Sequence, residues 1–113
     1  MIWVEAGVAF LSLPKTPETG GLMSEAAIAR MKPGAVLVNT ARGELVNQAT
    51  LVAALQSGQL AAAGLDLIAA EPLDPANPPL GLPNVMLAPH VAWPSAGTFV
   101  QSISIAAENC RRL

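Results

Sequence analysis

Four short apolar segments recur along this chain, each long enough for a strand but too short for an ordinary helix. None of them alternates strictly between apolar and polar residues, and such continuous apolar runs are typical of strands buried on both faces. Segments with helical character lie between them, and strands that alternate with helices predict a parallel sheet. We therefore expect an α/β fold, a doubly wound parallel sheet with flanking helices. The expected strands are Val8–Leu13, Ala35–Asn39, Leu60–Asp66 and Val85–Leu87.

Capping residues mark where the intervening helices begin and end. Ser24 and Asn47 are residue types whose side chains accept hydrogen bonds from the first N–H groups of a helix. Gly58 stands where the second helix would need a residue with positive φ to end it. The Pro-rich stretch from Glu71 to Pro83 predicts no regular structure. The expected helices are Ser24 through Arg30, with Ile28 and Met31 facing inward, Gln48–Ser57, with an apolar stripe of Leu51, Val52 and Leu55, and Ser95–Arg112.

The composition argues against several classes of function. The 113 residues form one domain at most, and a hydrophobic content of 52% is enough to bury a core. The net charge is −2 and the largest basic cluster is Arg111-Arg112, which argues against a nucleic-acid partner. No apolar run approaches the roughly 18 residues of a membrane span, the N-terminal residues do not resemble a signal peptide, and Cys110 has no second cysteine to pair with. We expect a cytoplasmic protein with no metal site and no membrane partner.

Chemically versatile side chains follow three of the expected strands. Because the carboxyl ends of parallel strands share one edge of a sheet, Arg42, Asp66 and His90 are expected to lie near one another. Arg42 offers a planar fork that can hold a carboxylate; the alternative is an arginine that satisfies carbonyl groups at a strand end. His90 is suited to donate and accept protons near neutral pH; the alternative is a lone histidine held in a loop.

The two carboxylates of this region also have a functional and a structural interpretation. Glu71 can orient His90 and stabilise its protonated form, or it is a solvated loop residue. Asp66 can accept a hydrogen bond from a carboxamide or a sugar hydroxyl, or it caps a turn. The structural alternatives weaken jointly, because suitable groups follow three different strands at one edge of the sheet.

Six motifs are distributed over nearly the whole chain. They are Leu13-Pro14-Lys15-Thr16-Pro17-Glu18-Thr19, Met31-Lys32-Pro33-Gly34-Ala35, Asn39-Thr40-Ala41-Arg42-Gly43, Leu65-Asp66…Glu71-Pro72, Leu82-Pro83-Asn84-Val85 and Pro89-His90-Val91-Ala92-Trp93. In this order they resemble the motifs of the D-isomer-specific 2-hydroxyacid dehydrogenases. The resemblance implies a partial Rossmann-type fold, an NAD or NADP cofactor and a small 2-hydroxy or 2-keto acid as substrate. The Trp after His-x-Ala resembles the branch that acts on glycerate, hydroxypyruvate or phosphoglycerate.

The resemblance also implies roles for individual residues. Arg42 matches the substrate-binding arginine, His90 matches the catalytic acid/base, and Glu71 matches the carboxylate paired with that histidine. In the implied reaction, hydride passes between the cofactor and C2 of the acid while His90 transfers the proton. The positions that match cofactor-binding residues are Leu13, Pro14, Thr19, Thr40, Ala41, Arg42, Asp66, His90 and Ala92.

Other features of that family have no counterpart in this sequence. The glycine fingerprint G-x-G-x-x-G, the residue that selects NAD over NADP and the substrate domain are missing, and Ser12 stands where many members have histidine. We therefore expect residues 1–113 to be the C-terminal half of a dinucleotide-binding domain, a fragment that is poorly stable and inactive alone, from a full-length enzyme that is a homodimer. The alternatives are a non-catalytic, corepressor-like interaction protein and an adenosylhomocysteine hydrolase-like half-domain, which the motif order disfavours.

Overall fold

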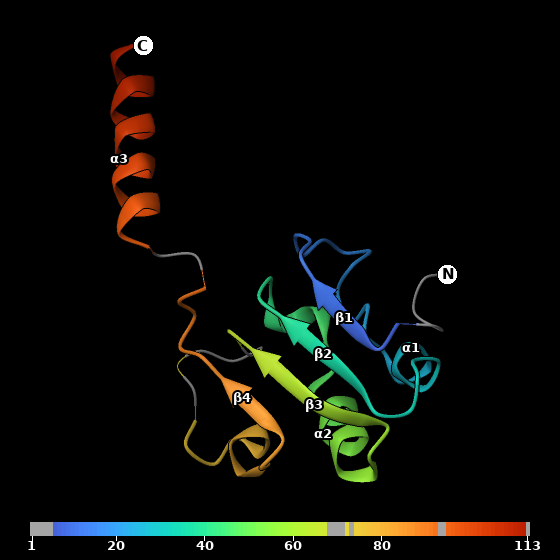
Figure 1. The fold of residues 1–113 in the computed structure, drawn as a ribbon. Helices are drawn as coiled ribbons and strands as arrows, with labels where there is room; N and C mark the ends of the chain where they lie inside the picture. Colours follow the sequence, from blue (N-terminus) through green and yellow to red (C-terminus); the bar gives the residue numbers. More distant parts are fainter. Residues whose placement is uncertain (1–5, 68–71, 73, 93–94, 113) are drawn as a thin grey trace.

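The computed structural model contains one four-stranded parallel sheet whose strands lie side by side in the order of the sequence, β1-β2-β3-β4 (Figure 1). It describes residues 6–67, 72, 74–92 and 95–112. Helices or 3-10 turns separate successive strands, so the predicted α/β class and the parallel strand direction are confirmed. The strands are β1 (Val8–Leu11), β2 (Ala35–Asn39), β3 (Leu60–Leu65) and β4 (Val85–Leu87), and the α-helices are α1 (Glu25–Ala29), α2 (Gln48–Ser57) and α3 (Ala96–Arg111).

The core lies between the sheet and the two short helices. Successive residues of a strand point to opposite faces, and in β2 the alternation buries Leu37 completely while Val38 on the other face is half-buried. The helix α2 packs against β3, and α1 contacts α2. The buried hydrophobic residues that form this core are Ala9, Leu11, Met23, Ile28, Met31, Ala35, Leu37, Leu45, Val46, Leu51, Ala54, Leu55, Leu60, Ala63 and Leu65.

The predicted helix caps are confirmed. The Ser24 hydroxyl accepts a hydrogen bond from the N–H of Ala27, and the Asn47 side chain accepts one from the N–H of Thr50. Gly58 ends α2 with a φ of 80°, a conformation that glycine adopts without steric cost. The apolar stripe of α2 differs by one residue from the prediction, because Ala54 is buried and Val52 is half-buried.

Several element ends differ by one or two residues from the predictions. The strand β1 ends at Leu11, two residues earlier than expected, and α1 ends at Ala29 with Arg30 as its cap. The strand β3 ends at Leu65 instead of Asp66, and α3 spans Ala96–Arg111 with Ser95 and Arg112 as its caps. The Pro-rich stretch contains the 3-10 helix η3 (Pro78–Gly81), although no regular structure was expected there. Proline is compatible with the first turn of a helix, because its fixed φ suits that turn and its missing N–H would have no partner there.

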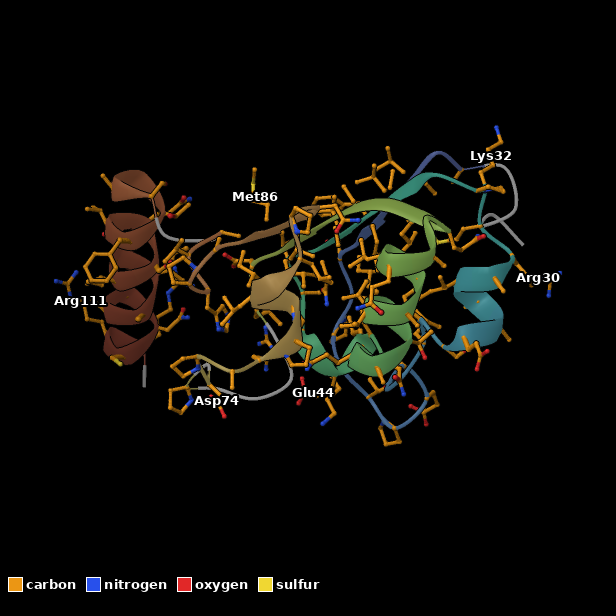
Figure 2. The ribbon with its side chains drawn as sticks, turned by 90° about the horizontal axis from the view of Figure 1, so that it is seen from below. Arg30, Lys32, Glu44, Asp74, Met86 and Arg111 are labelled. Carbon is orange, nitrogen blue, oxygen red and sulfur yellow. The ribbon has the colours of Figure 1, made fainter. Side chains whose placement is uncertain are left out.

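The second face of the sheet is open in the described residues, whereas the sequence predicted cover on both faces. Val8 and Phe10 are each 60% exposed and Met86 is 77% exposed. The register places Phe10 beside Val38 and Gly64 beside Met86, so these residues belong to one continuous face. Figure 2 shows Met86 pointing away from the side of the sheet on which α1 and α2 lie.

The last helix, α3, stands apart from the sheet (Figure 1). A capping box fixes its first turn, in which the Ser95 hydroxyl accepts from the N–H of Thr98 and the Thr98 hydroxyl accepts from the N–H of Ser95. None of its residues is buried, and Phe99 and Ile103 are more than half exposed. No helix among the described residues is long and apolar enough to cross a membrane.

The asymmetry between the two faces of the sheet can be tested with one substitution on each. Leu37→Ala removes a fully buried side chain, so we expect the free energy of unfolding to fall by about 2–5 kcal/mol. Met86→Ala removes an exposed side chain, and we expect a change within about 0.5 kcal/mol. Urea unfolding followed by circular dichroism measures both, and equal losses of stability would contradict the assignment of faces.

Candidate functional site

The carboxyl ends of the four strands meet at one edge of the sheet, as the parallel pairing requires. Residues that follow β2, β3 and β4 line a groove of about 400 Å³ at this edge. The lining residues are Thr40, Arg42, Asp66, His90 and Ala92, all of which the sequence had singled out. The expectation that these strand-end residues lie together is thus met by the fold.

A second groove, of about 580 Å³, lies beside the first. It extends to the loop after β1 and includes Leu13, Pro14 and Ala41 from the predicted set. Thr40 and Arg42 line both grooves, so the two share a boundary at the end of β2. The remaining lining residues of the second groove are Ser12, Lys15 and Glu44.

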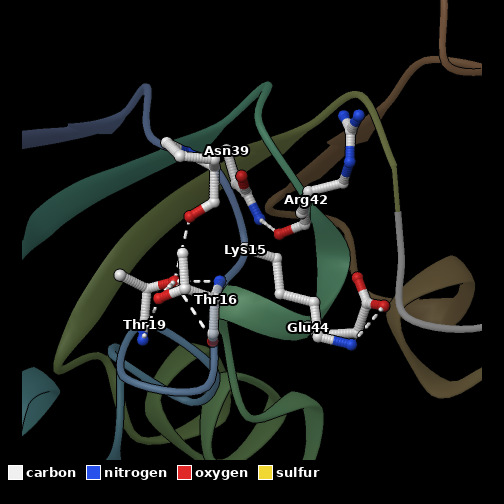
Figure 3. A network of polar contacts seen from close by, with 7 residues as sticks. Lys15, Thr16, Thr19, Asn39, Arg42 and Glu44 are labelled. Carbon is white, nitrogen blue, oxygen red and sulfur yellow. Dashed lines mark hydrogen bonds and ion pairs between the residues drawn. The ribbon is translucent and has the colours of Figure 1, made fainter.

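Asn39 shapes the turn that carries Arg42, a role that the sequence analysis did not assign. Its Nδ2 donates to the carbonyl of Arg42 at 2.7 Å (Figure 3). Asn39 is 1% exposed, and its Oδ1 accepts from the N–H of Ala41 at 3.1 Å. This arrangement satisfies a buried amide with backbone groups and folds residues 40–42 back over the strand end. The sequence signal for this role was that Asn39, an amide, occupies an inward-facing position of an otherwise apolar strand.

Arg42 itself is exposed at the boundary of the two grooves. Its Nη1 donates to the carbonyl of Ala41 at 2.6 Å, so one of the terminal nitrogens of the guanidinium group contacts the turn. A guanidinium carries five N–H donors in a planar fork, and such a fork suits a carboxylate. The side chain that the sequence proposed for carboxylate binding is therefore accessible to a small molecule.

Asp66 is the one buried carboxylate among the described residues, at 4% exposure. Its Oδ1 accepts from the N–H of Val91 and its Oδ2 from the N–H of Ala92, both at 2.8 Å. Its own N–H donates to the carbonyl of Asn39 at 3.0 Å, which ties the end of β3 to the end of β2. Asp66 thus connects the sheet to the segment that follows His90.

His90 lies on the surface of the first groove, with a φ of 57° in the left-handed region. Its backbone N–H donates to the carbonyl of Asp66 at 2.7 Å. Glu71, predicted to pair with His90, and Trp93 lie outside the described residues.

Thr19 does not line either groove, although it was predicted among the cofactor-binding residues. Its hydroxyl donates to the carbonyl of Pro14 at 2.9 Å and accepts from the N–H of Thr16 at 2.7 Å (Figure 3). Thr19 therefore acts on the second groove indirectly, by fixing the loop to which Pro14 belongs.

An ion pair stands at the rim of the second groove. Lys15 Nζ lies 3.2 Å from Glu44 Oε1 (Figure 3). The pKa of the Glu44 carboxyl is below its ordinary value, because its own backbone N–H and the Lys15 ammonium donate hydrogen bonds to it. The pKa of Glu18 is also lowered, by a hydrogen bond from the side chain of Thr16 and by its own backbone N–H.

No group of three or more His, Cys, Asp or Glu side chains that could hold a metal ion occurs within the described ranges. Cys110 is exposed on α3. The titratable or charged side chains that line the first groove are Arg42, Asp66 and His90.

Lys15→Met provides a test of the ion pair. We expect it to raise the pKa of Glu44 toward 4.5, because the ammonium donor is lost, and to leave the pKa of Glu18 unchanged as an internal control. Since the folded-state pKa is the lowered one, the stabilising effect exists above the pKa of the unfolded chain and is lost as pH falls through the folded value. NMR titration of the side-chain carboxyl carbons measures both groups, and an unmoved Glu44 would refute the role of Lys15.

Comparison with known proteins identifies relatives of this chain. The sequence is 39% identical over 105 residues to the hydroxypyruvate reductase of Blautia hydrogenotrophica and 44% identical over 105 residues to the glyoxylate reductase of Korarchaeum cryptofilum. These alignments cover 93% of this chain but 33% and 32% of the two relatives. The chain therefore spans about a third of the length of the curated relatives it matches.

Solved structures show the same fold. A D-isomer specific 2-hydroxyacid dehydrogenase from Lactobacillus delbrueckii, in its NAD complexed form, superposes with a TM-score of 0.85 at 31% identity over 95% of this chain and 37% of that one. The enzyme of the same description from Xanthobacter autotrophicus, in complex with NADPH and MES, gives 0.74 at 43% identity over 76% and 28%. Residues 2–92 match the family model described as "D-isomer specific 2-hydroxyacid dehydrogenase, NAD binding domain". The chain therefore belongs to the D-isomer-specific 2-hydroxyacid dehydrogenase family, and its partial Rossmann-type sheet is part of that family's NAD-binding domain.

Proposed function

We propose that this chain is part of an NAD(P)-dependent oxidoreductase that interconverts a small 2-keto acid and the corresponding 2-hydroxy acid. The observation that carries the proposal is the single groove at the strand ends that contains both Arg42 and His90. One of these groups suits a carboxylate and the other suits a proton transfer, and a 2-keto acid needs both. The relatives reported above have the names of enzymes, which favours catalysis over the corepressor-like alternative.

The grooves suit a cofactor built of two parts. Each has a volume within the range of about 300–1,000 Å³ that is usual for small-molecule sites. They meet at Thr40 and Arg42, so a single extended molecule can enter both. Leu13 and Pro14 would hold the adenosine side, with Thr19 bracing their loop. The residues that would surround the nicotinamide side are Thr40, Ala41, Asp66, His90 and Ala92.

The reaction follows from the chemistry of the groups. A nicotinamide cofactor, when held by these residues, would supply the hydride for reduction of the acid at C2 or take it up in the reverse direction. Arg42 holds the substrate carboxylate with its planar fork, which orients the keto group toward His90. In the reductive direction His90 donates a proton to the keto oxygen as that oxygen gains negative charge, and in the oxidative direction it removes the proton from the hydroxyl group. Glu71 would hold the imidazole ring and stabilise its protonated form.

The proposal includes the context of the chain. Residues 1–113 would form the C-terminal half of the dinucleotide-binding domain of a homodimeric cytoplasmic enzyme acting on glyoxylate or hydroxypyruvate. The share of its relatives that the chain covers supports the domain assignment, and their names support the substrate class. The exposed thiol of Cys110 suits a reducing compartment.

A chimaera tests the proposed roles of Arg42 and His90. The chain replaces the matching 105 residues of the glyoxylate reductase of Korarchaeum cryptofilum, and NADH oxidation with glyoxylate is followed by absorbance. We expect His90→Gln to lower kcat by about 10²–10⁴-fold, because the proton donor is lost. Arg42→Lys is expected to raise KM for glyoxylate, because an ammonium cannot replace the planar fork.

Arg30→Lys makes the same chemical change as Arg42→Lys at an exposed position outside both grooves, and it should leave kinetics unchanged. A folded chimaera that reduces glyoxylate equally well with His90→Gln would refute the proposed acid/base role.

The isolated chain is expected to show no measurable turnover with glyoxylate or hydroxypyruvate and NADH or NADPH. The physical reason is that the pyrophosphate of a dinucleotide is usually held by a glycine-rich turn at a helix N-terminus, and this sequence has no such motif. His90→Ala serves as the baseline, and turnover above that baseline would contradict the prediction.

A further inference from the structure

The backbone of His90 has a conformation that needs an explanation. With a φ of 57°, it is the one residue other than glycine that has a positive φ in the described part of the chain. In this region the Cβ atom crowds the carbonyl oxygen, so a residue with a side chain stays there only when its surroundings hold it. The hydrogen bonds of residues 90–92 show which residue holds His90 in this conformation.

Three successive N–H groups converge on one residue. The N–H of His90 donates to the backbone carbonyl of Asp66 at 2.7 Å. The N–H groups of Val91 and Ala92 donate to Oδ1 and Oδ2 of the same residue, each at 2.8 Å. Successive N–H groups around a left-handed residue form a concave site for an anion, and here the anion is a carboxylate of the protein.

The carboxylate is fixed to the rigid part of the fold. Asp66 is 4% exposed, and a buried carboxylate is tolerated only when hydrogen bonds replace its water. Its N–H donates to the carbonyl of Asn39 at the end of β2, so its position is set by the pairing of two central strands. Hydrogen bonds to an ionised acceptor are stronger than those between neutral groups.

We infer that Asp66 is a positioning residue whose two carboxylate oxygens, by binding the N–H groups of Val91 and Ala92, hold His90 in its left-handed conformation and fix where its imidazole stands in the groove. The inference rests on the proposed function for the role of the imidazole, and on the geometry alone for the role of Asp66. It is distinct from a direct contact between Asp66 and the cofactor, because it acts through the backbone.

The two contacts require two acceptor oxygens. Asparagine has the same shape as aspartate, but it has one acceptor oxygen and an NH₂ group that would face an N–H donor. Asp66→Asn therefore breaks one of the two contacts and removes the charge from both. Asp74→Asn is the matched control, because Asp74 Oδ1 accepts from the N–H of Ala76 at 2.8 Å in an exposed loop.

The first test is NMR spectroscopy of the 113-residue chain without cofactor. In the unsubstituted chain we expect scalar couplings across the hydrogen bonds from the amide nitrogens of Val91 and Ala92 to Cγ of Asp66. We also expect a strong NOE between the N–H and Hα of His90, since a positive φ brings these two protons close together. Asp66→Asn should weaken this NOE and shift both amide signals, whereas Asp74→Asn should change neither.

The measurement on the unsubstituted chain decides the inference even where Asp66→Asn prevents folding. Absence of the two couplings and of the strong NOE in the folded chain overturns it. An NOE of unchanged strength in folded Asp66→Asn overturns it as well.

The second test is kinetic and uses the chimaera with glyoxylate reductase. A displaced imidazole affects the transition state rather than substrate binding, so Asp66→Asn is expected to lower kcat by about 100-fold with little change in KM for glyoxylate. A raised KM for NADH with unchanged kcat would instead assign Asp66 to cofactor binding and overturn the inference. An inactive chimaera with an unsubstituted segment would count against the proposed function, while the NMR result on Asp66 would stand independently.

Discussion

The pairing of β2 with β3 is the constraint on which the site depends. These strands run parallel and keep one register from Val36 to their last residues, where Asn39 lies beside Leu65. The ladder ends in the hydrogen bond from the N–H of Asp66 to the carbonyl of Asn39. The buried side chains of Asn39 and Asp66 lie at this point, and both form hydrogen bonds with backbone groups of loops that follow the strands. One loop carries Arg42 and the other carries His90, so the strand pairing brings both loops to the same groove.

The elements that local sequence determines were predicted well. Apolar runs placed the four strands, and Ser24, Asn47 and Gly58 placed helix ends because capping depends on a few neighbouring residues. The grouping of Arg42, Asp66 and His90 was also predictable, since it follows from strand direction. The 3-10 helix at Pro78–Gly81 was missed, because the same prolines that break an α-helix are compatible with a single tighter turn.

What the sequence could not reveal depends on contacts between distant residues. Asp66 was interpreted through its carboxylate as a partner for a ligand or as a turn cap, whereas its oxygens bind N–H groups 25 and 26 residues further along the chain. Thr19 was predicted among the cofactor-binding residues, and the structure adds that its hydroxyl braces the loop of Pro14. The continuous apolar strands predicted that both faces of the sheet are covered. Such a pattern indicates that a face needs burial, but it does not indicate which element covers that face.

The open face of the sheet determines how this chain will behave at high concentration. Val8, Phe10 and Met86 expose apolar surface, and within the described ranges β1 pairs with β2 alone, which leaves its outer backbone groups able to template a further strand. These two properties together favour association between molecules in preference to a dispersed monomer. Sulfate and phosphate salts strengthen apolar burial, so they should increase the particle size that light scattering detects. A low concentration of urea weakens apolar burial, so it should decrease that size.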